Sequence, residues 1–168
     1  MLKEKFTPTI VLLCICLSVA LLLAGVNLVT LPIIKEAQEQ KLQDSLRKVM
    51  PDGQDFEEIS TDILDATVTK AFKEKNGGFV FQVEVTGYKP GLIVVCGIDA
   101  DGKITGADYI SSNETLSAEV GLGEKFVGHT CATITPDIIA GPTAKLTTNA
   151  YYKAIQISLE SYSTLANK

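Results

Sequence analysis

The sequence contains one histidine, four cysteines and no charged residue between Phe6 and Ile34. The histidine, His129, has no cysteine or carboxylate at a spacing typical of metal sites, so no metal centre is predicted. No G-x-S-x-G motif accompanies it, which argues against a serine hydrolase. The chain also lacks G-x-G-x-x-G and G-x-x-x-x-G-K-[S/T], so we exclude nucleotide binding through either motif.

Basic residues are too few and too scattered to form a patch interleaved with aromatics. The formal net charge is −5, and nucleic acid is therefore not an expected partner. The acidic turn at residues 99–102 begins like a calcium loop. Its twelfth position is Ile110 rather than the glutamate that an EF-hand loop requires, so a plain hairpin turn is predicted.

The uncharged N-terminal stretch is almost continuous Ile, Val, Leu, Cys and Ala from Ile10 to Val29. That length is sufficient to cross a hydrocarbon core, and it exceeds the roughly 7–15 apolar residues of a cleaved signal peptide. We therefore expect a retained single-span anchor in the cell membrane. Basic residues flank the stretch on both sides and do not fix its orientation.

The four cysteines divide into two pairs. Cys14 and Cys16 lie within the apolar stretch, where lipid contact or helix packing is expected. Cys96 and Cys131 lie in the remainder of the chain. In an exported domain they could form a disulfide, and as small hydrophobes they could equally be buried free thiols.

The remaining chain predicts one α+β domain, a twisted and mainly antiparallel sheet with packed helices, preceded by a transmembrane helix and a helical stalk. We divide the chain into a tail and anchor (1–34), a stalk and connector (35–65) and a domain (66–168). Residues 55–65 are expected to form a surface turn or a short helix. The predicted strands are 66–72, 79–85, 92–98 and 103–111, with a break in alternation near Gly106, and the predicted helices are 35–49, 121–127 and 147–166.

Three consecutive segments carry the functional signal: GIDADGKITG at residues 97–106, ETLSAEVGLGEKF at 114–126 and DIIAGPT at 137–143. In this order they resemble the FMN-binding domain family. There, a G-I-D-x-D-G-K-I hairpin leads into E-T-P-G-L-G and then to a D-x-x-[S/T]-G-A-T signature. The resemblance covers roughly residue 66 to the C-terminus. The anchor and stalk match the branch of that family formed by the G subunits of Rnf ion-translocating oxidoreductases.

The resemblance implies that a flavin transferase esterifies the phosphate of FMN onto the hydroxyl of Thr143. Gly141 permits close backbone approach, Lys145 can pair with phosphate, and the start of the last helix favours an anion. Thr147 or Thr148 could cap that helix. The candidate cofactor-binding residues are Thr143, Asp137, Gly141, Lys145, Thr147, Thr148, Glu114, Thr115, Gly121, Leu122 and Gly123.

Within this set, the Gly121–Gly123 turn is expected to approach the isoalloxazine ring, with Leu122 against its face. The signature departs from the family at Ala140 and Pro142. Alignment from the C-terminal side would place Lys145 at the attachment position, and lysine cannot form this phosphoester. No catalytic or metal-binding residue is predicted.

The resemblance therefore implies a membrane-anchored FMN carrier in an Rnf-type complex that couples ferredoxin and NAD to ion movement. Its FMN domain would lie on the extracytoplasmic side, and its partners would be the other membrane and peripheral subunits and the flavin transferase. Two alternatives remain open. One is a docking or assembly subunit without flavin, and the other is a stand-alone flavinylated domain for extracellular electron transfer.

Overall fold

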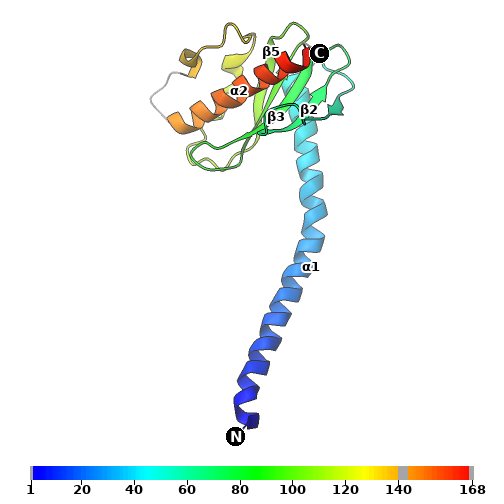
Figure 1. Ribbon diagram of the computed structural model, residues 1–168, viewed down its shortest axis with the longest axis vertical. Coiled ribbons are helices and arrows are strands. Elements are labelled where there is room, and N and C mark those ends of the chain that lie inside the picture. Colours follow the sequence, from blue (N-terminus) through cyan, green and yellow to red (C-terminus); the bar gives the residue numbers. More distant parts are fainter. Residues whose placement is uncertain (1, 140–143, 167–168) are drawn as a thin grey trace. The chain divides into compact units, whose positions relative to one another are not determined.

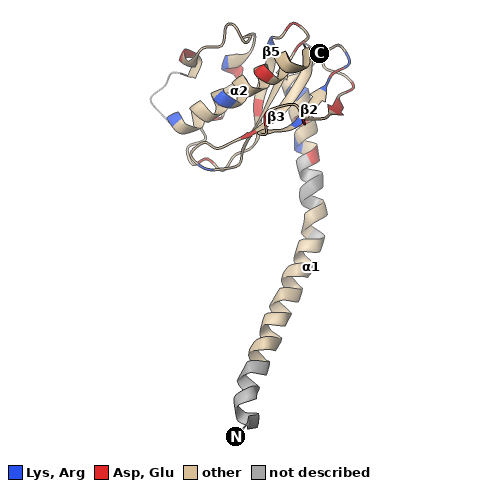
Figure 2. Cartoon of the chain, in the orientation of Figure 1, with Lys and Arg blue, Asp and Glu red and all other residues tan. Residues whose placement is uncertain are grey.

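The computed structural model describes residues 2–139 and 144–166, and the chain forms two compact units, Met1–Gln40 and Lys41–Lys168. Helix α1 spans Leu2–Val49 (Figure 1). Its segment Val11–Pro32 has a mean hydropathy of 2.6 and, in the described residues, is the one helical stretch long and apolar enough to cross a membrane. Figure 2 shows no Lys, Arg, Asp or Glu along the coloured part of this segment.

The second unit is built on an antiparallel meander whose five strands lie in chain order, from β1 to β5. The α+β class predicted from the sequence is confirmed. The strands are β1 Glu57–Ile59, β2 Val68–Lys73, β3 Phe79–Val85, β4 Leu92–Ile98 and β5 Ile104–Ser111.

Strands β3 and β4 coincide with their predicted ranges, and β5 begins one residue later than predicted. The predicted break in alternation is a bulge: Gly97 pairs with Gly106 and Ile98 with Ile104, which leaves Thr105 unpaired. The expectation for residues 55–65 was wrong at Glu57–Ile59, which pairs with β2 as an edge strand. This strand has three residues and no buried side chain, so it leaves no alternating pattern in the sequence.

Helix α2, Lys145–Ala166, covers one face of the sheet and contacts β3 and β4 (Figure 1). It begins two residues before the predicted helix. Two short 3-10 helices, η1 at Gly123–Phe126 and η2 at Pro136–Ile139, lie in the connection from β5 to α2. The apolar run of β4 is buried on both faces, as predicted from its unbroken hydrophobicity.

The face of the sheet opposite α2 is covered by the last turns of α1, which belong to the second unit. The helix contributes Leu42, Leu46 and Val49, and Met50 follows it directly. These residues pack with Phe72, Val80 and Val95. Residues 42–50 thus supply four of the seven buried residues of this second core.

Two paired glycines, Gly97 on β4 and Gly106 on β5, leave the space that the end of α1 occupies. A Cβ on Gly97 would lie 2.8 Å from the carbonyl oxygen of Val49, and a Cβ on Gly106 would lie 2.7 Å from its Cα. The hydroxyl of Thr105 donates a hydrogen bond of 2.6 Å to the same carbonyl. Beside it, Lys48 Nζ lies 2.9 Å from Asp108 Oδ2, and this hydrogen-bonded pairing raises the pKa of Lys48.

The cysteines of the second unit are both free thiols in the structure. Cys96 is fully buried on β4, and burial raises the pKa of its thiol to about 12. Cys131 is exposed. The sequence left open a disulfide or two free thiols. The structure has two free thiols, of which one is buried and one is exposed.

We expect this difference to appear in thiol labelling, because the thiolate is the reactive species and Cys96 is both inaccessible and hard to deprotonate. In a Cys14→Ala/Cys16→Ala protein at pH 8, a maleimide should modify one thiol in the folded state and a second after unfolding. Mass spectrometry of the labelled protein counts the adducts. Two adducts in the folded state would contradict the burial of Cys96, and none after unfolding without reductant would indicate a disulfide.

Candidate functional site

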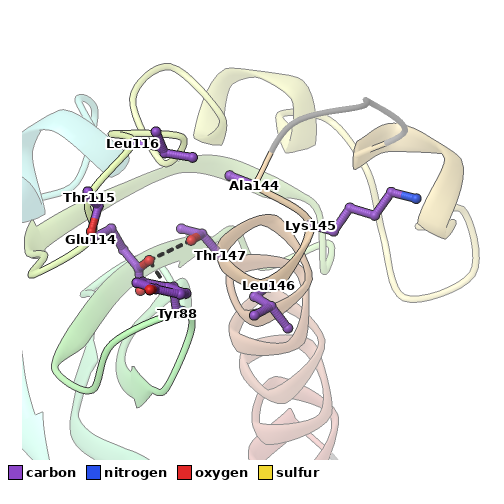
Figure 3. A pocket seen from close by; sticks show the side chains of 8 residues that line it. All are labelled: Tyr88, Glu114, Thr115, Leu116, Ala144, Lys145, Leu146 and Thr147. Carbon is purple, nitrogen blue, oxygen red and sulfur yellow. Dashed lines mark hydrogen bonds between the residues drawn. The ribbon is translucent and has the colours of Figure 1, made fainter.

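A cavity of about 380 Å³ lies where three segments meet: the β3–β4 turn, the loop after β5 and the first turn of α2. Figure 3 shows the side chains around it. Three of them, Tyr88, Leu116 and Leu146, are large and more than 60% exposed. The lining residues are Tyr88, Glu114, Thr115, Leu116, Ala144, Lys145, Leu146 and Thr147.

The carboxylate of Glu114 joins the three segments. Its Oε2 accepts hydrogen bonds from the Thr147 hydroxyl at 2.6 Å and from the Tyr88 amide at 3.2 Å. Its Oε1 accepts one from the Lys89 amide at 3.1 Å. Hydrogen bonds to a charged acceptor are stronger than neutral ones, so this single side chain fixes the relative positions of the cavity walls.

Gly87 provides the space for this arrangement. A Cβ at that position would lie 2.5 Å from Glu114 Oε1 and 3.2 Å from the Cα of Thr147. A glycine is required here by close approach of a carboxylate and of helix backbone, and not by an unusual φ. The neighbouring Asn113 reinforces the contact, since its Nδ2 donates to the carbonyl of Pro90 at 3.1 Å.

The start of α2 differs from the capping arrangement considered in the sequence analysis. Thr147 donates its hydroxyl to Glu114, and Thr148 donates to the carbonyls of Ala144 and Lys145, each at 3.3 Å. Ala144 has a φ of 51°, which a residue with a side chain rarely adopts. Strained backbone of this kind is frequent at functional sites.

The structure brings Glu114, Thr115, Lys145 and Thr147 together around the cavity. Asp137 is exposed on η2. Gly141 and Thr143 lie outside the described residues. Thr143 directly precedes Ala144, which lines the cavity.

The turn at residues 121–123 lies elsewhere. Leu122 is 5% exposed and packs in the main core, and a Cβ on Gly123 would overlap the carbonyl of Ala107 on β5. Gly121, with a φ of 70°, borders a separate depression together with Lys48 and Asp108.

Sequence reasoning missed five residues of this site: Gly87, Tyr88, Leu116, Ala144 and Leu146. The segment GYKPG was treated only as a break between strands, and its closeness to the start of α2 depends on the folded sheet. The exposed Leu116 was the available signal, because a large apolar residue in a polar loop is often part of a binding surface. His129 is half-buried, and its carbonyl accepts a hydrogen bond from the Ile104 amide.

Comparison with known proteins places the chain in a family. No family model matches it. It is 31% identical over 142 residues to the G subunit of the Na⁺-translocating ferredoxin:NAD⁺ oxidoreductase complex of Acetobacterium woodii, covering 75% of this chain and 67% of the relative. The chain belongs to the family of Rnf G subunits. Membership in this family, together with the apolar segment Val11–Pro32, makes this a single-pass membrane protein.

Proposed function

We propose that this protein is the FMN-carrying electron-transfer subunit of an Rnf-type ion-translocating ferredoxin:NAD oxidoreductase complex. The FMN is held by a phosphoester to Thr143. The observation that carries the proposal is the cavity at the first turn of α2, whose wall includes Ala144, the residue that follows Thr143. The relative in Acetobacterium woodii is named as a subunit of such a complex.

The residues present suit a flavin. A volume of about 380 Å³ lies within the roughly 300–1,000 Å³ of small-molecule sites, which combine apolar walls with a few polar groups. Tyr88, Leu116 and Leu146 offer apolar surface for a flat ring system, and Glu114 and Lys145 supply charge.

Each group has a distinct role in this proposal. The hydroxyl of Thr143 is the attachment point. Lys145, an exposed cation on the first turn of α2, pairs with the phosphate, and the free amides at that helix end also favour an anion. When bound, FMN supplies the electron-transfer chemistry, while the protein determines its position and its electrostatic surroundings.

The proposed location is the cell membrane. The helix around Val11–Pro32 anchors the chain, and we propose that the FMN domain lies on the extracytoplasmic side. The partners are the other membrane and peripheral subunits of the complex, and a flavin transferase acts during maturation. A phosphoester keeps the flavin attached where free FMN would be lost.

Intact-mass analysis of protein produced with a flavin transferase tests the proposal. A single adduct of one FMN less one water is expected, and peptide mapping should place it on the peptide that contains Thr143. An unmodified mass from native material would instead favour the docking or assembly subunit, which needs no flavin.

We expect Asp137→Ala to reduce the flavinylated fraction severalfold while leaving the fold intact. Asp137 is exposed on η2, and we propose that the transferase recognises its carboxylate. In-gel flavin fluorescence after denaturation measures the fraction. Asp101→Ala removes an equally exposed carboxylate from the β4–β5 turn and serves as the control. Equal labelling of the two variants would remove Asp137 from the recognition signal.

A further inference from the structure

Glu114 is the one acidic side chain among the residues that line the cavity. It is held there from two sides, by the amides of Tyr88 and Lys89 in the β3–β4 turn and by the hydroxyl of Thr147 on α2. A carboxylate with these three hydrogen bonds cannot rotate into solvent without breaking them. Its charge therefore occupies a fixed position in the wall.

Among the described residues, no ion pair neutralises that charge. In the part of the chain that the structure describes, the ion pairs are Lys48 with Asp108 and Lys75 with Asp55, and Glu114 takes part in neither. Lys145 also lines the cavity, but Figure 3 shows its side chain directed away from the Glu114 carboxylate. The three donors are neutral groups, so they orient the carboxylate and leave its net charge in place.

We propose that Glu114 lowers the reduction potential of the flavin in this cavity, because its fixed carboxylate opposes the negative charge that the ring gains with electrons. The inference rests on the proposed function and assigns Glu114 a role in it. Half-burial and apolar neighbours reduce the screening of the charge, so its field acts over several ångströms. Charge beside the ring is one of the means by which a protein sets flavin electronics.

The test is a reductive titration of the detergent-solubilised, flavinylated full-length protein with dithionite and reference dyes, followed by flavin absorbance. Glu114→Gln keeps the size and an acceptor oxygen but removes the charge. The ratio of reduced to oxidised flavin at a fixed potential should rise about five- to tenfold, the order expected for a unit charge at intermediate dielectric.

Two matched variants distinguish an effect of the Glu114 charge from an effect of its hydrogen bonds. Glu160→Gln removes the same charge from an exposed position on α2, about 20 Å along the helix from Thr147, and should leave the potential unchanged. Glu114→Asp keeps the charge and should stay close to wild type. Equal potentials for the Glu114→Gln and Glu160→Gln variants would overturn the inference, as would an Asp variant that shifts as far as the Gln variant.

If Glu114→Gln does not fold, Thr115→Glu adds a carboxylate at an exposed lining position and must lower the same ratio. An unchanged ratio in that variant would also overturn the inference. A wild-type protein without any flavin adduct would overturn the proposed function itself. If the Glu114→Gln and Glu160→Gln variants both carry flavin and have equal reduction potentials, only the role of Glu114 would be overturned.

Discussion

A Thr143→Val variant is expected to carry no covalent flavin. Valine has nearly the same shape as threonine but no hydroxyl, so the phosphoester cannot form. Intact mass should equal that of the unmodified chain, and fluorescence should disappear from the denatured band. This all-or-none outcome is the largest effect that a single substitution in this protein should produce.

Thr164→Val is the matched control, because it removes a threonine hydroxyl at the other end of α2. The Thr164 side chain is exposed and its hydroxyl donates to the carbonyl of Glu160, so its loss should leave the label in place. Persistent label in the Thr143→Val variant would move the attachment to another residue.

The second large effect concerns the end of α1. A fragment of residues 41–168 should fold cooperatively, whereas a fragment of residues 51–168 should not. The longer fragment retains Leu46 and Val49, each 1% exposed. Without them, Val80 and Val95, which are now fully buried, would face water.

The free energy lost with these side chains explains why the shorter fragment should not fold. Removing one buried leucine side chain costs about 2–5 kcal/mol, and the deleted segment contributes four buried apolar residues to a domain whose total stability is on the order of 5–15 kcal/mol. Urea denaturation followed by circular dichroism measures the difference. Leu46→Asp in the longer fragment should resemble the deletion, and Arg47→Asp, at an exposed neighbour, should not. A cooperative transition in the shorter fragment at the same urea concentration would contradict the assigned core.

The sheet was predictable where burial leaves a local pattern. Strands β3 and β4 are rich in β-branched and aromatic residues and end at glycine-containing turns, so both ranges were confirmed. β1 was not predictable, because its pairing with β2 uses backbone groups and none of its three side chains is fully buried. The last turns of α1 were predicted as helix, but their burial depends on a sheet that follows them in the chain.

The candidate site was also predictable only in part. Glu114, Thr115, Lys145 and Thr147 were singled out from their motifs, and the structure brings them to one cavity. Tyr88 and Gly87 come from a turn 26 or more residues away from Glu114, and only the antiparallel register of the strands brings that turn alongside. Gly121 and Leu122 follow Glu114 closely in the sequence, yet both lie outside the cavity. Leu122 packs in the main core, and Gly121 is exposed beside a separate depression.

The paired glycines of β4 and β5 also bear on the order in which the protein is made. Val49 packs into the space left by the missing side chains of Gly97 and Gly106. This space forms only when the β4–β5 hairpin has formed. Residues 42–50 leave the ribosome well before that hairpin. Their apolar side chains therefore remain exposed to solvent until the β4–β5 hairpin has formed. Bulkier residues at Gly97 or Gly106 would overlap the backbone of Val49, so these apolar side chains would stay exposed and the newly made chain would be accessible to proteases.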